Sequence, residues 1–335
     1  MPYQDCIWPA SAPETEEVAS TVKVLDTVDS TNSLIARAVA ASEYPDARQC
    51  VAHLFEQSET AASSASSDAE DREQSQALPI SIAISDVQTK CRGRQGRSWF
   101  NKPGESLLSS WAMPISRDVL DAQYSGWLTT LCGLALIDAI NEVSGNHHLH
   151  ALNPSSVNPN TQNPNTQNPD NQLMLKWPND VFCQGRKLAG ILCEMVPVNE
   201  HSAVLIIGIG MNLFVPKDDL PIDMSTSLQL QYEPLPPYAE LRDELVCATT
   251  QYLRKEFSAF MANPSHAIPE LSERIKAASW TLGKQVKAHL ADDKQVLGRA
   301  LRINADASLT ILRHDGCEQK ITTADVGVLP DVSPQ

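Results

Sequence analysis

The chain has 335 residues, which is enough for one large domain or two smaller ones with a substantial buried core. Hydrophobic residues make up 42% of it, as in an ordinary soluble protein, and no stretch has the roughly 18 consecutive apolar residues of a membrane span. The formal net charge is −15, so the composition does not predict a general basic face for nucleic acid.

The amino-terminal segment and the cysteines indicate the compartment. Residues 1–20 contain acidic residues and no Lys or Arg, so they lack the basic start of a secretory signal. The eight cysteines form no C-x-x-C pair and show no zinc-ligand spacing, and we interpret most of them as reduced core residues. The sequence therefore predicts a cytoplasmic protein without a membrane segment, beginning with a disordered acidic tail at 1–21.

Two polar segments have the composition of insertions. Residues 56–78 are rich in Ser, Ala and Glu and show no periodicity. Residues 146–172 include the near-repeat NPNTQNPNTQNP, which has too little apolar content to bury a core. We expect both segments to be mobile loops.

The remaining sequence up to residue 278 alternates between strand and helix patterns. Ser-Thr-Asn at 30–32 precedes an Ala-rich helix that runs to about residue 39. Apolar residues at helical spacing predict longer helices at 121–143, 237–261 and 267–278. This pattern indicates a mixed α and β domain over 22–278, with strands expected at 22–28, 80–87, 107–113, 173–176, 188–195 and 203–211.

The pattern changes after residue 280. Short, partly alternating runs at 284–290, 296–303 and 309–313 predict strands, and His-Asp-Gly at 314–316 is a hairpin turn signal. Residues 321–329 could complete a small barrel. The sequence therefore predicts a second, all-β domain at about 281–330.

An arginine-rich loop at 88–99, hereafter the arginine loop, follows one predicted strand. It has three arginines and two glycines within 92–97. Glycines let backbone amides approach an anion, and guanidinium groups match carboxylate and phosphate oxygens. Trp99 adds a flat surface for a purine ring or a wedge into the core. The alternative is a solvated basic turn, and the loop matches neither a P-loop nor a Rossmann fingerprint.

Lys-Trp-Pro-Asn-Asp at 176–180 ends an apolar strand. Lys176 could supply a point charge for a phosphate or carboxylate oxygen, and Asp180 could orient a cation. The alternative is a lysine cap followed by an ordinary turn. Lys187 begins the next buried run and could reach the same side of the sheet as Lys176.

Gly-Ile-Gly-Met-Asn at 208–212 lies in another apolar strand. Its two glycines permit close approach of a ligand or of a neighbouring backbone, and Asn212 supplies an amide at the strand end. A packing role for the glycines is the alternative.

Taken in chain order, these segments resemble the biotin protein ligase family. Its pattern runs Ser-Thr-Asn, Gly-Arg-Gly-Arg-x-Gly-Arg-x-Trp, Lys-Trp-Pro-Asn-Asp, Lys-Leu-Ala-Gly-Ile-Leu and Gly-Ile-Gly-x-Asn, and all five occur within 24–213. One departure is Cys91, where the family usually has glycine. The resemblance implies an α+β fold of the class II synthetase type, a mixed sheet packed by helices, with a small carboxy-terminal SH3-like β-barrel.

The resemblance also implies an activity. The enzyme would form biotinyl-5′-AMP from biotin and ATP and transfer biotin to a lysine of the biotin carboxyl carrier domain of a carboxylase. Mg²⁺ would bind mainly through phosphate, without a dedicated protein metal site. Some 22 residues precede the first predicted strand, too few for the family's helix-turn-helix, so we expect no DNA binding. We expect a monomer or homodimer.

By resemblance, the catalytic residues are Arg92, Arg94, Lys176, Asp180 and Lys187. The other residues expected to bind biotin or ATP come from the same segments. Biotin would meet Arg92, Arg94 and Lys176 together with Ser30, Thr31, Asn32, Gln88, Gly93, Gly190, Gly208 and Gly210, and ATP would meet Arg94 and Lys187 together with Trp99, Asn179 and Asn212. Two alternatives stay open: a lipoate or octanoate ligase or transferase of the same fold, and a non-catalytic biotin or nucleotide sensor.

Overall fold

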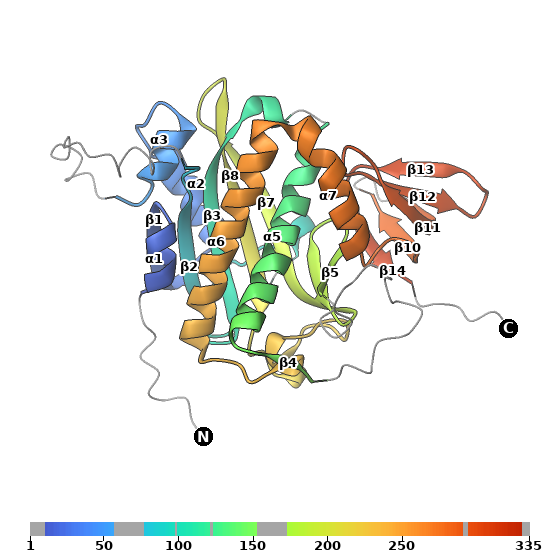
Figure 1. Cartoon of the computed structure of the whole chain (residues 1–335), viewed down its shortest axis with the longest axis horizontal. Coiled ribbons are helices and arrows are strands. Elements are labelled where there is room, and N and C mark those ends of the chain that lie inside the picture. The colour runs from blue at the N-terminus through green and yellow to red at the C-terminus, as the bar shows by residue number, and fades with distance from the viewer. Residues whose placement is uncertain are drawn as a thin grey trace.

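A computed structural model describes residues 11–56, 77–97, 99–120, 123–152, 173–290 and 294–329. A mixed seven-stranded sheet forms the centre, helices cover it, and a smaller sheet lies at one end (Figure 1). This arrangement confirms the α+β class that was expected from the sequence.

The central sheet has one parallel pair, β1 with β2, and its other neighbouring strands are antiparallel. All six strands expected before residue 278 are present, and a further strand, β6, follows the Lys-Trp-Pro-Asn turn. In sheet order the strands are β1 (Thr21–Val28), β2 (Ser81–Gln88), β3 (Ser106–Ser116), β8 (Ser202–Asn212), β7 (Arg186–Pro197), β6 (Asp180–Cys183) and β5 (Leu173–Lys176).

Alternating side chains divide the sheet between two cores. Ile82 and Trp111 belong to the core shared with the long helices α5 (Ser125–Asn146) and α6 (Tyr238–Ala262), which lie in front of the sheet in Figure 1. Ala83 and Ala112, the next residue of each strand, pack instead with Ile35 of α2. Both faces are therefore buried, the second beneath α2 (Thr31–Ala40) and α3 (Ala47–Ala52).

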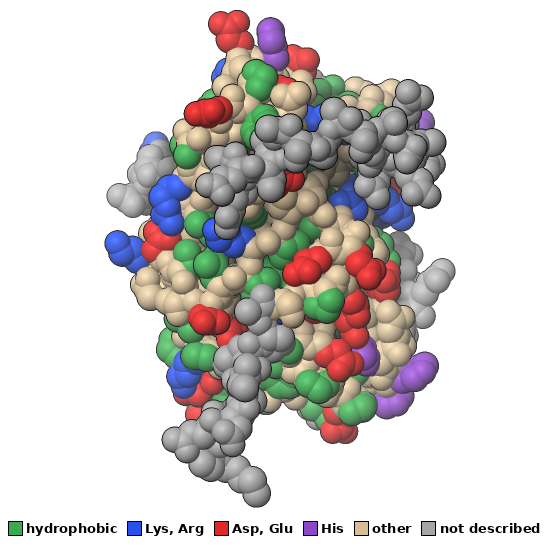
Figure 2. Space-filling view, turned by 90° about the vertical axis from the view of Figure 1, so that its left-hand side faces the viewer, with side chains coloured by type: hydrophobic (Ala, Val, Ile, Leu, Met, Phe, Trp, Pro, Cys, Tyr) green, Lys and Arg blue, Asp and Glu red, His purple; other side chains and the backbone are tan. Residues whose placement is uncertain are grey.

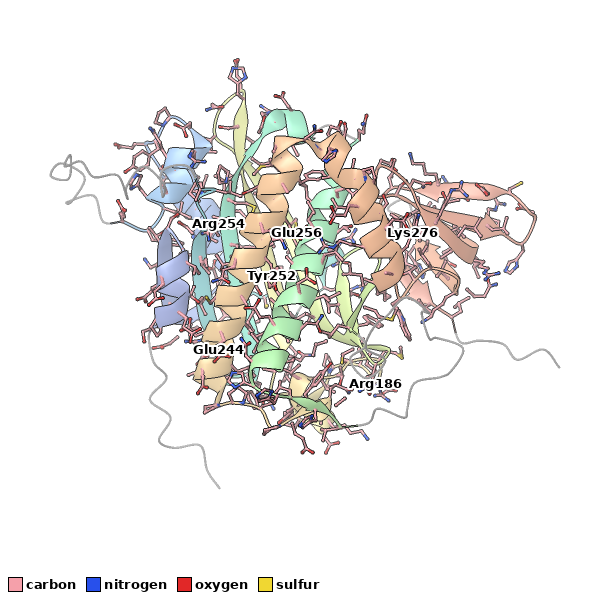
Figure 3. All side chains as sticks on the ribbon, in the orientation of Figure 1. Arg186, Glu244, Tyr252, Arg254, Glu256 and Lys276 are labelled. Carbon is pink, nitrogen blue, oxygen red and sulfur yellow. The ribbon has the colours of Figure 1, made fainter. Side chains whose placement is uncertain are left out.

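A third helix, α7 (Pro264–Ala278), follows α6 and packs against it. Arg274 of α7 forms an ion pair with Glu256 of α6 at 2.8 Å (Figure 3 labels Glu256). Tyr252 of α6 donates a hydrogen bond to Glu142 of α5 at 2.7 Å. These contacts join the three helices into one layer. Among the helices described, none combines the length and apolar character that a membrane crossing requires.

The amino-terminal segment is ordered from residue 11, so the disordered tail expected at 1–21 is wrong for residues 11–21. It forms the helix α1 (Pro13–Val18), whose amino end is capped from α6. The backbone N–H groups of Glu14 and Thr15 donate to the Asp243 carboxylate at 3.0 and 3.1 Å. Arg254 of α6 (Figure 3) donates to the carbonyls of Val18 and Leu78. Tertiary contacts, not local sequence, therefore fix this helix.

Acidic side chains gather beside α1, in the lower right of the face that Figure 2 shows. The pKa of Glu14 is raised by partial burial and by neighbouring carboxylates, namely those of Glu244, Asp243, Glu17 and Glu240. Part of the net charge of −15 is therefore concentrated on this side of the molecule.

Both expected insertions are shorter than predicted. Leu78 is buried in the main core, and β4 (His150–Ala151) pairs with β9 (Tyr232–Glu233). Residues 77–78 and 146–152 therefore belong to the folded domain. Most of the two segments, 57–76 and 153–172, lies outside the described residues.

The carboxy-terminal strands form a five-stranded antiparallel sheet in the order β13-β12-β11-β10-β14. The edge strands β13 and β14 do not pair in the described residues, because β14 adds to the far side of β10. The sheet is therefore consistent with the small SH3-like domain expected from the sequence, although its strands do not close into a barrel in the described residues. Their bounds are β10 (Gln285–His289), β11 (Gln295–Ile303), β12 (Leu309–Arg313), β13 (Glu318–Ile321) and β14 (Asp325–Val328).

Two tryptophans join this sheet to the larger domain. Trp127 of α5 donates through Nε1 to the Ala305 carbonyl at 2.8 Å, and Trp177 donates to the Ala307 carbonyl at 2.9 Å. The Trp177 backbone N–H also donates to Thr281 Oγ1 at 2.9 Å. The small sheet is therefore bonded directly to the turn that contains the Lys-Trp-Pro-Asn-Asp motif.

Candidate active site

Two lysines face one buried carboxylate where β5, β6 and β7 meet. The β5–β6 hairpin pairs Lys176 with Asp180 across the turn. Lys187 Nζ lies 2.8 Å from Asp180 Oδ1, and Lys176 Nζ lies 3.4 Å from Asp180 Oδ2. Asp180 is 7% exposed. Each carboxylate oxygen therefore faces one ammonium group, and the pair of cations is held at a single point of the sheet.

Burial alters the cations of this site. It lowers the pKa of Lys176, and the nearby Asp180 carboxylate opposes this effect. Burial also lowers the pKa of Arg94, again against the attraction of Asp180. A guanidinium keeps its proton at any physiological pH, whereas a buried lysine can lose it. Lys176 is therefore a titratable cation of the site.

The arginine loop folds back over this cluster. The Gly93 N–H donates to the Arg97 carbonyl at 2.6 Å, which closes the turn η1 (Arg94–Gly96). Arg94 donates to Asn179 Oδ1 at 3.2 Å and to Thr323 Oγ1 of the carboxy-terminal sheet at 3.1 Å. The loop, the Lys-Trp-Pro-Asn-Asp turn and the small sheet thus meet at one side chain.

Trp99, the last residue of the loop, lies on two strand glycines. A Cβ atom would lie 2.9 Å from the Trp99 ring at Gly210 and 3.1 Å at Gly190, so a larger residue at either position would push the indole away. Lys187 Nζ lies 5.5 Å from the ring centroid. In this structure the two glycines therefore make room for Trp99, whereas the sequence interpretation placed them against biotin.

The Ser-Thr-Asn segment lies on strands β3, β8 and β7, which follow one another in the sheet. The Asn32 side chain donates to Glu194 Oε2 at 2.7 Å, and its oxygen lies 2.6 Å from Ser110 Oγ. A Cβ atom at Gly208 would lie 2.3 Å from Asn32 Oδ1, so only glycine leaves space for this amide. Ser30 Oγ accepts the Ser33 N–H at 3.4 Å and caps α2.

A cavity of about 100 Å³ opens between the arginine loop and the sheet. It brings together seven residues that the sequence singled out, from the loop, the Lys-Trp-Pro-Asn-Asp turn and β7. Its lining is Gly93, Arg94, Arg97, Trp99, Asn179, Asp180, Lys187, Gly190, Ile191 and Leu192. Arg and Lys side chains thus surround a small space in which glycine backbone is exposed.

Other predicted residues lie outside this lining. Asn212 is 5% exposed and donates to the Thr226 carbonyl at 2.8 Å, so its N–H supports the following loop. Gln88 Oε1 accepts the Thr31 N–H at 3.2 Å. Arg92 donates to Ser33 Oγ at 3.0 Å and lies beside Glu194.

Sequence reasoning missed several residues of the site. Arg97 was visible in the Arg/Gly run. Ile191 and Leu192 end the Lys-Leu-Ala-Gly-Ile-Leu motif, but as apolar strand residues they were not named as site residues. Thr323 carried no functional signal in the sequence, because its contact with Arg94 spans 229 positions of the chain. Glu194 gave no signal because its partners come from two other segments.

Cys91, which departs from the family pattern, fits its position. The described residues other than glycine that have a positive φ do not include Cys91, so its backbone does not need the conformation that favours glycine. Burial raises the pKa of its thiol to about 11. Cys91 is therefore a neutral, half-buried side chain at neutral pH.

Comparisons with known proteins show which proteins this chain resembles. Residues 59–212 match the model of the biotin/lipoate A/B protein ligase family. The chain is 27% identical to the biotin–[acetyl-CoA-carboxylase] ligase of Mycobacterium tuberculosis over 230 residues, 69% of this chain and 72% of the relative. It is 26% identical to the bifunctional ligase/repressor BirA of Bacillus subtilis over 73% of this chain. That match covers 65% of the relative, slightly less than two thirds of its length.

Solved structures show the same fold over nearly the whole chain. The biotin protein ligase of Aquifex aeolicus, in complex with biotin and ATP, aligns with a TM-score of 0.57 at 19% identity. The alignment covers 92% of this chain and 98% of that one. The family match covers the arginine loop, the Lys-Trp-Pro-Asn-Asp turn and strands β7 and β8, the segments that build the site. The chain is therefore similar in sequence to biotin protein ligases over the segments that build the site, and similar in fold over nearly its whole length.

Proposed function

We propose that this protein is an ATP-dependent biotin–protein ligase. It would join biotin to ATP as biotinyl-5′-AMP and then transfer biotin to a lysine of a biotin carboxyl carrier domain. One observation carries the proposal: Arg94, Lys187 and the backbone of Gly93 line one cavity, beside a carboxylate that holds two lysines. This arrangement suits a reaction between two anions.

In the first step, a carboxylate oxygen of biotin attacks the α-phosphorus of ATP, and the bond to the pyrophosphate oxygen breaks. The two reactants repel each other, and negative charge grows on the phosphate oxygens in the transition state. Fixed cations that face this charge lower the activation barrier. One well-placed donor raises the rate by about 10²–10³-fold. We assign this role to Arg94 and Lys187, which line the cavity, and to Lys176, which lies beside the same Asp180 carboxylate.

In the second step, the neutral amine of the acceptor lysine attacks the carbonyl carbon of the mixed anhydride. The bond to the AMP oxygen breaks, and the new amide loses a proton to water. The same cations stabilise the negative charge on the leaving phosphate, so they serve this step as well. The same cavity can therefore support both half-reactions.

Asp180 suits the positioning of lysines better than the binding of a metal ion. Both of its oxygens already face ammonium groups. When bound, Mg²⁺ would supply positive charge against the phosphate groups, and it commonly keeps several of its own waters. We therefore propose that Mg²⁺ binds mainly through the ATP phosphates, while Asp180 orients Lys176 and Lys187.

The cavity must widen to admit its substrates. At about 100 Å³ it is smaller than the roughly 300–1,000 Å³ of typical ligand pockets. The Trp99 ring lies against Gly190 and Gly210. We propose that Trp99 moves away from these two glycines when ligands bind and that its indole then faces the nucleotide. Biotin would lie toward Ser30, Thr31 and Gln88.

The remaining parts of the proposal concern partners. The acceptor is the carrier domain of a biotin-dependent carboxylase, the working unit is a monomer or homodimer, and no DNA is bound. The cytoplasmic location stays a prediction, as do the roles of Asn32, Gly208 and Asn212 toward ligands.

A pyrophosphate-release assay tests the activity. The full-length protein is mixed with ATP and Mg²⁺ and with biotin, lipoate or octanoate in separate reactions. We expect release with biotin only. Release with lipoate or octanoate would identify the other branch of the biotin/lipoate family, and no release with any acid would point to a sensor.

Transfer is tested separately with a purified carrier domain and radiolabelled biotin. The matched control is the same domain with its acceptor lysine changed to arginine. Label on the first domain alone supports the proposal, and equal labelling of both would contradict it.

A further inference from the structure

Glu194, on β7, lies where the Ser-Thr-Asn segment and the arginine loop meet. Its Oε2 atom accepts a hydrogen bond from Asn32 Nδ2 at 2.7 Å and lies 3.3 Å from Arg92 Nη2. Asn32 belongs to the Ser-Thr-Asn segment and Arg92 to the arginine loop. One carboxylate oxygen therefore joins two segments that lie 60 positions apart in the chain.

The amide of Asn32 is fully occupied in this arrangement. Its Nδ2 donates to Glu194 and also to the Leu192 carbonyl at 3.3 Å, and its Oδ1 lies 2.6 Å from Ser110 Oγ. Asn32 is 4% exposed, and Gly208 leaves the space it needs. An amide with both donors and its acceptor in use has one orientation. Asn32 is therefore a rigid anchor for Glu194.

Arg92 is the movable partner. Its side chain is 50% exposed, and Glu194 is 35% exposed, so the ion pair alone contributes little to stability. The same Nη2 atom also donates to Ser33 Oγ at 3.0 Å. The guanidinium is thus held from two sides, by β7 and by α2, at the place where the arginine loop leaves the sheet.

We propose that Glu194 is a positioning residue for the acid substrate. Asn32 fixes the position of the Glu194 carboxylate. That carboxylate then holds Arg92, the first arginine of the loop, against α2 before any ligand binds. The inference rests on the proposed function, since biotin is taken as the acid. A loop that is ordered in advance loses less conformational entropy on binding. Loss of Glu194 should therefore weaken acid binding more than it slows the chemical step.

Three variants test this role in the full-length protein. Glu194→Ala removes both contacts, and Glu194→Gln keeps an acceptor for Asn32 but removes the charge beside Arg92. Glu200→Ala changes an exposed glutamate in the turn after β7 and is the matched control. Pyrophosphate release is measured at varied biotin and, separately, at varied ATP.

We expect Glu194→Ala to raise the KM for biotin about tenfold and Glu194→Gln about threefold, the size of effect that a hydrogen bond to a charged group gives. The kcat and the KM for ATP should change less than twofold. An unchanged KM for biotin in both variants overturns the proposal. A common loss of kcat in both, with KM unchanged, would also overturn it, because a general structural defect behaves in that way.

Limited trypsin digestion gives a second readout that does not depend on activity. Trypsin cleaves after arginine, and the rate of cleavage at 92–97 in the ligand-free protein reports how firmly the loop is held. We expect faster cleavage in Glu194→Ala than in Glu200→Ala, at equal thermal stability. Equal rates would contradict the positioning role. If the wild-type protein releases no pyrophosphate with biotin, the proposed function fails, while this comparison still decides whether Glu194 holds the loop.

Discussion

Lys187 Nζ lies 2.8 Å from Asp180 Oδ1, so a carboxylate on β6 fixes a cation on the neighbouring strand β7. Asp180 pairs in register with Gly190, three residues after Lys187, and the β-bulge between Val181 and Phe182 shifts the pairing there. The lysine is therefore held by a side chain opposite its own strand and not by its neighbours in sequence. This relationship makes Lys187 a fixed charge at the cavity, which is the property that the proposed chemistry requires.

Loss of the Lys187 charge should slow the first step. We expect Lys187→Ala to lower the kcat for pyrophosphate release by about 10²–10³-fold, because a preorganised cation is removed from the transition state. Lys217→Ala, which changes an exposed lysine in the 3-10 turn η5 (Lys217–Asp219), should leave the rate unchanged. A loss of less than threefold in Lys187→Ala, measured by steady-state kinetics, would remove Lys187 from the mechanism.

The rate should fall at alkaline pH because of Lys176. Burial lowers the pKa of this lysine, so its charge disappears as pH rises through a value below the ordinary 10.5. The charged form is the active one in our proposal, and kcat should therefore decline across that range. Lys176→Arg keeps its proton and should move the alkaline limb to higher pH. The same alkaline limb in both proteins, in a kcat profile against pH, would assign the titration to another group.

Glycine at position 91 should bring no gain. The Cys91 backbone does not have the positive φ that would favour glycine, and its half-buried thiol is neutral at pH 7. We expect Cys91→Gly to change kcat/KM for biotin by less than about twofold, because no backbone strain is released. A gain of tenfold or more in the pyrophosphate assay would show that the cysteine side chain obstructs the substrate.

The carboxy-terminal sheet should influence the kinetics through Thr323. Its hydroxyl oxygen accepts a hydrogen bond from Arg94 at 3.1 Å. Thr323→Val removes this acceptor with little change in shape, and we expect kcat/KM to fall about three- to tenfold. Thr322→Val, at the exposed neighbouring residue, is the control. If both variants behave alike, the small sheet does not position Arg94.

The strands and long helices were predictable because each has its own periodicity. The helix at Trp127–Ile140 shows apolar residues at every turn, and β8 is a continuous apolar run. The helix α1 was not predictable, because the Asp243 carboxylate that caps it comes from another helix. The open shape of the small sheet was also invisible, since strand patterns do not tell which edges will pair.

The same distinction applies to the site. The motifs singled out Arg94, Lys176, Asp180 and Lys187, and their order, which resembles that of a known family, assigned them to one site. They could not show that Gly190 and Gly210 accommodate Trp99, since a strand glycine permits several kinds of close contact. Contacts between distant segments, such as that of Glu194 with Asn32, depend on the packing of the whole sheet and have no local pattern.

Trp177 has a consequence for anyone who wishes to shorten this protein. Its indole lies inside the motif that identifies the site, yet its N–H bonds to the Ala307 carbonyl in the carboxy-terminal sheet. A version that stops after α7 would leave the indoles of Trp177 and Trp127 without these acceptors and would free the turn that connects Lys176 to Asp180. The smallest fragment worth preparing as a labelling reagent therefore keeps the last five strands, even though every residue that lines the cavity lies between positions 93 and 192.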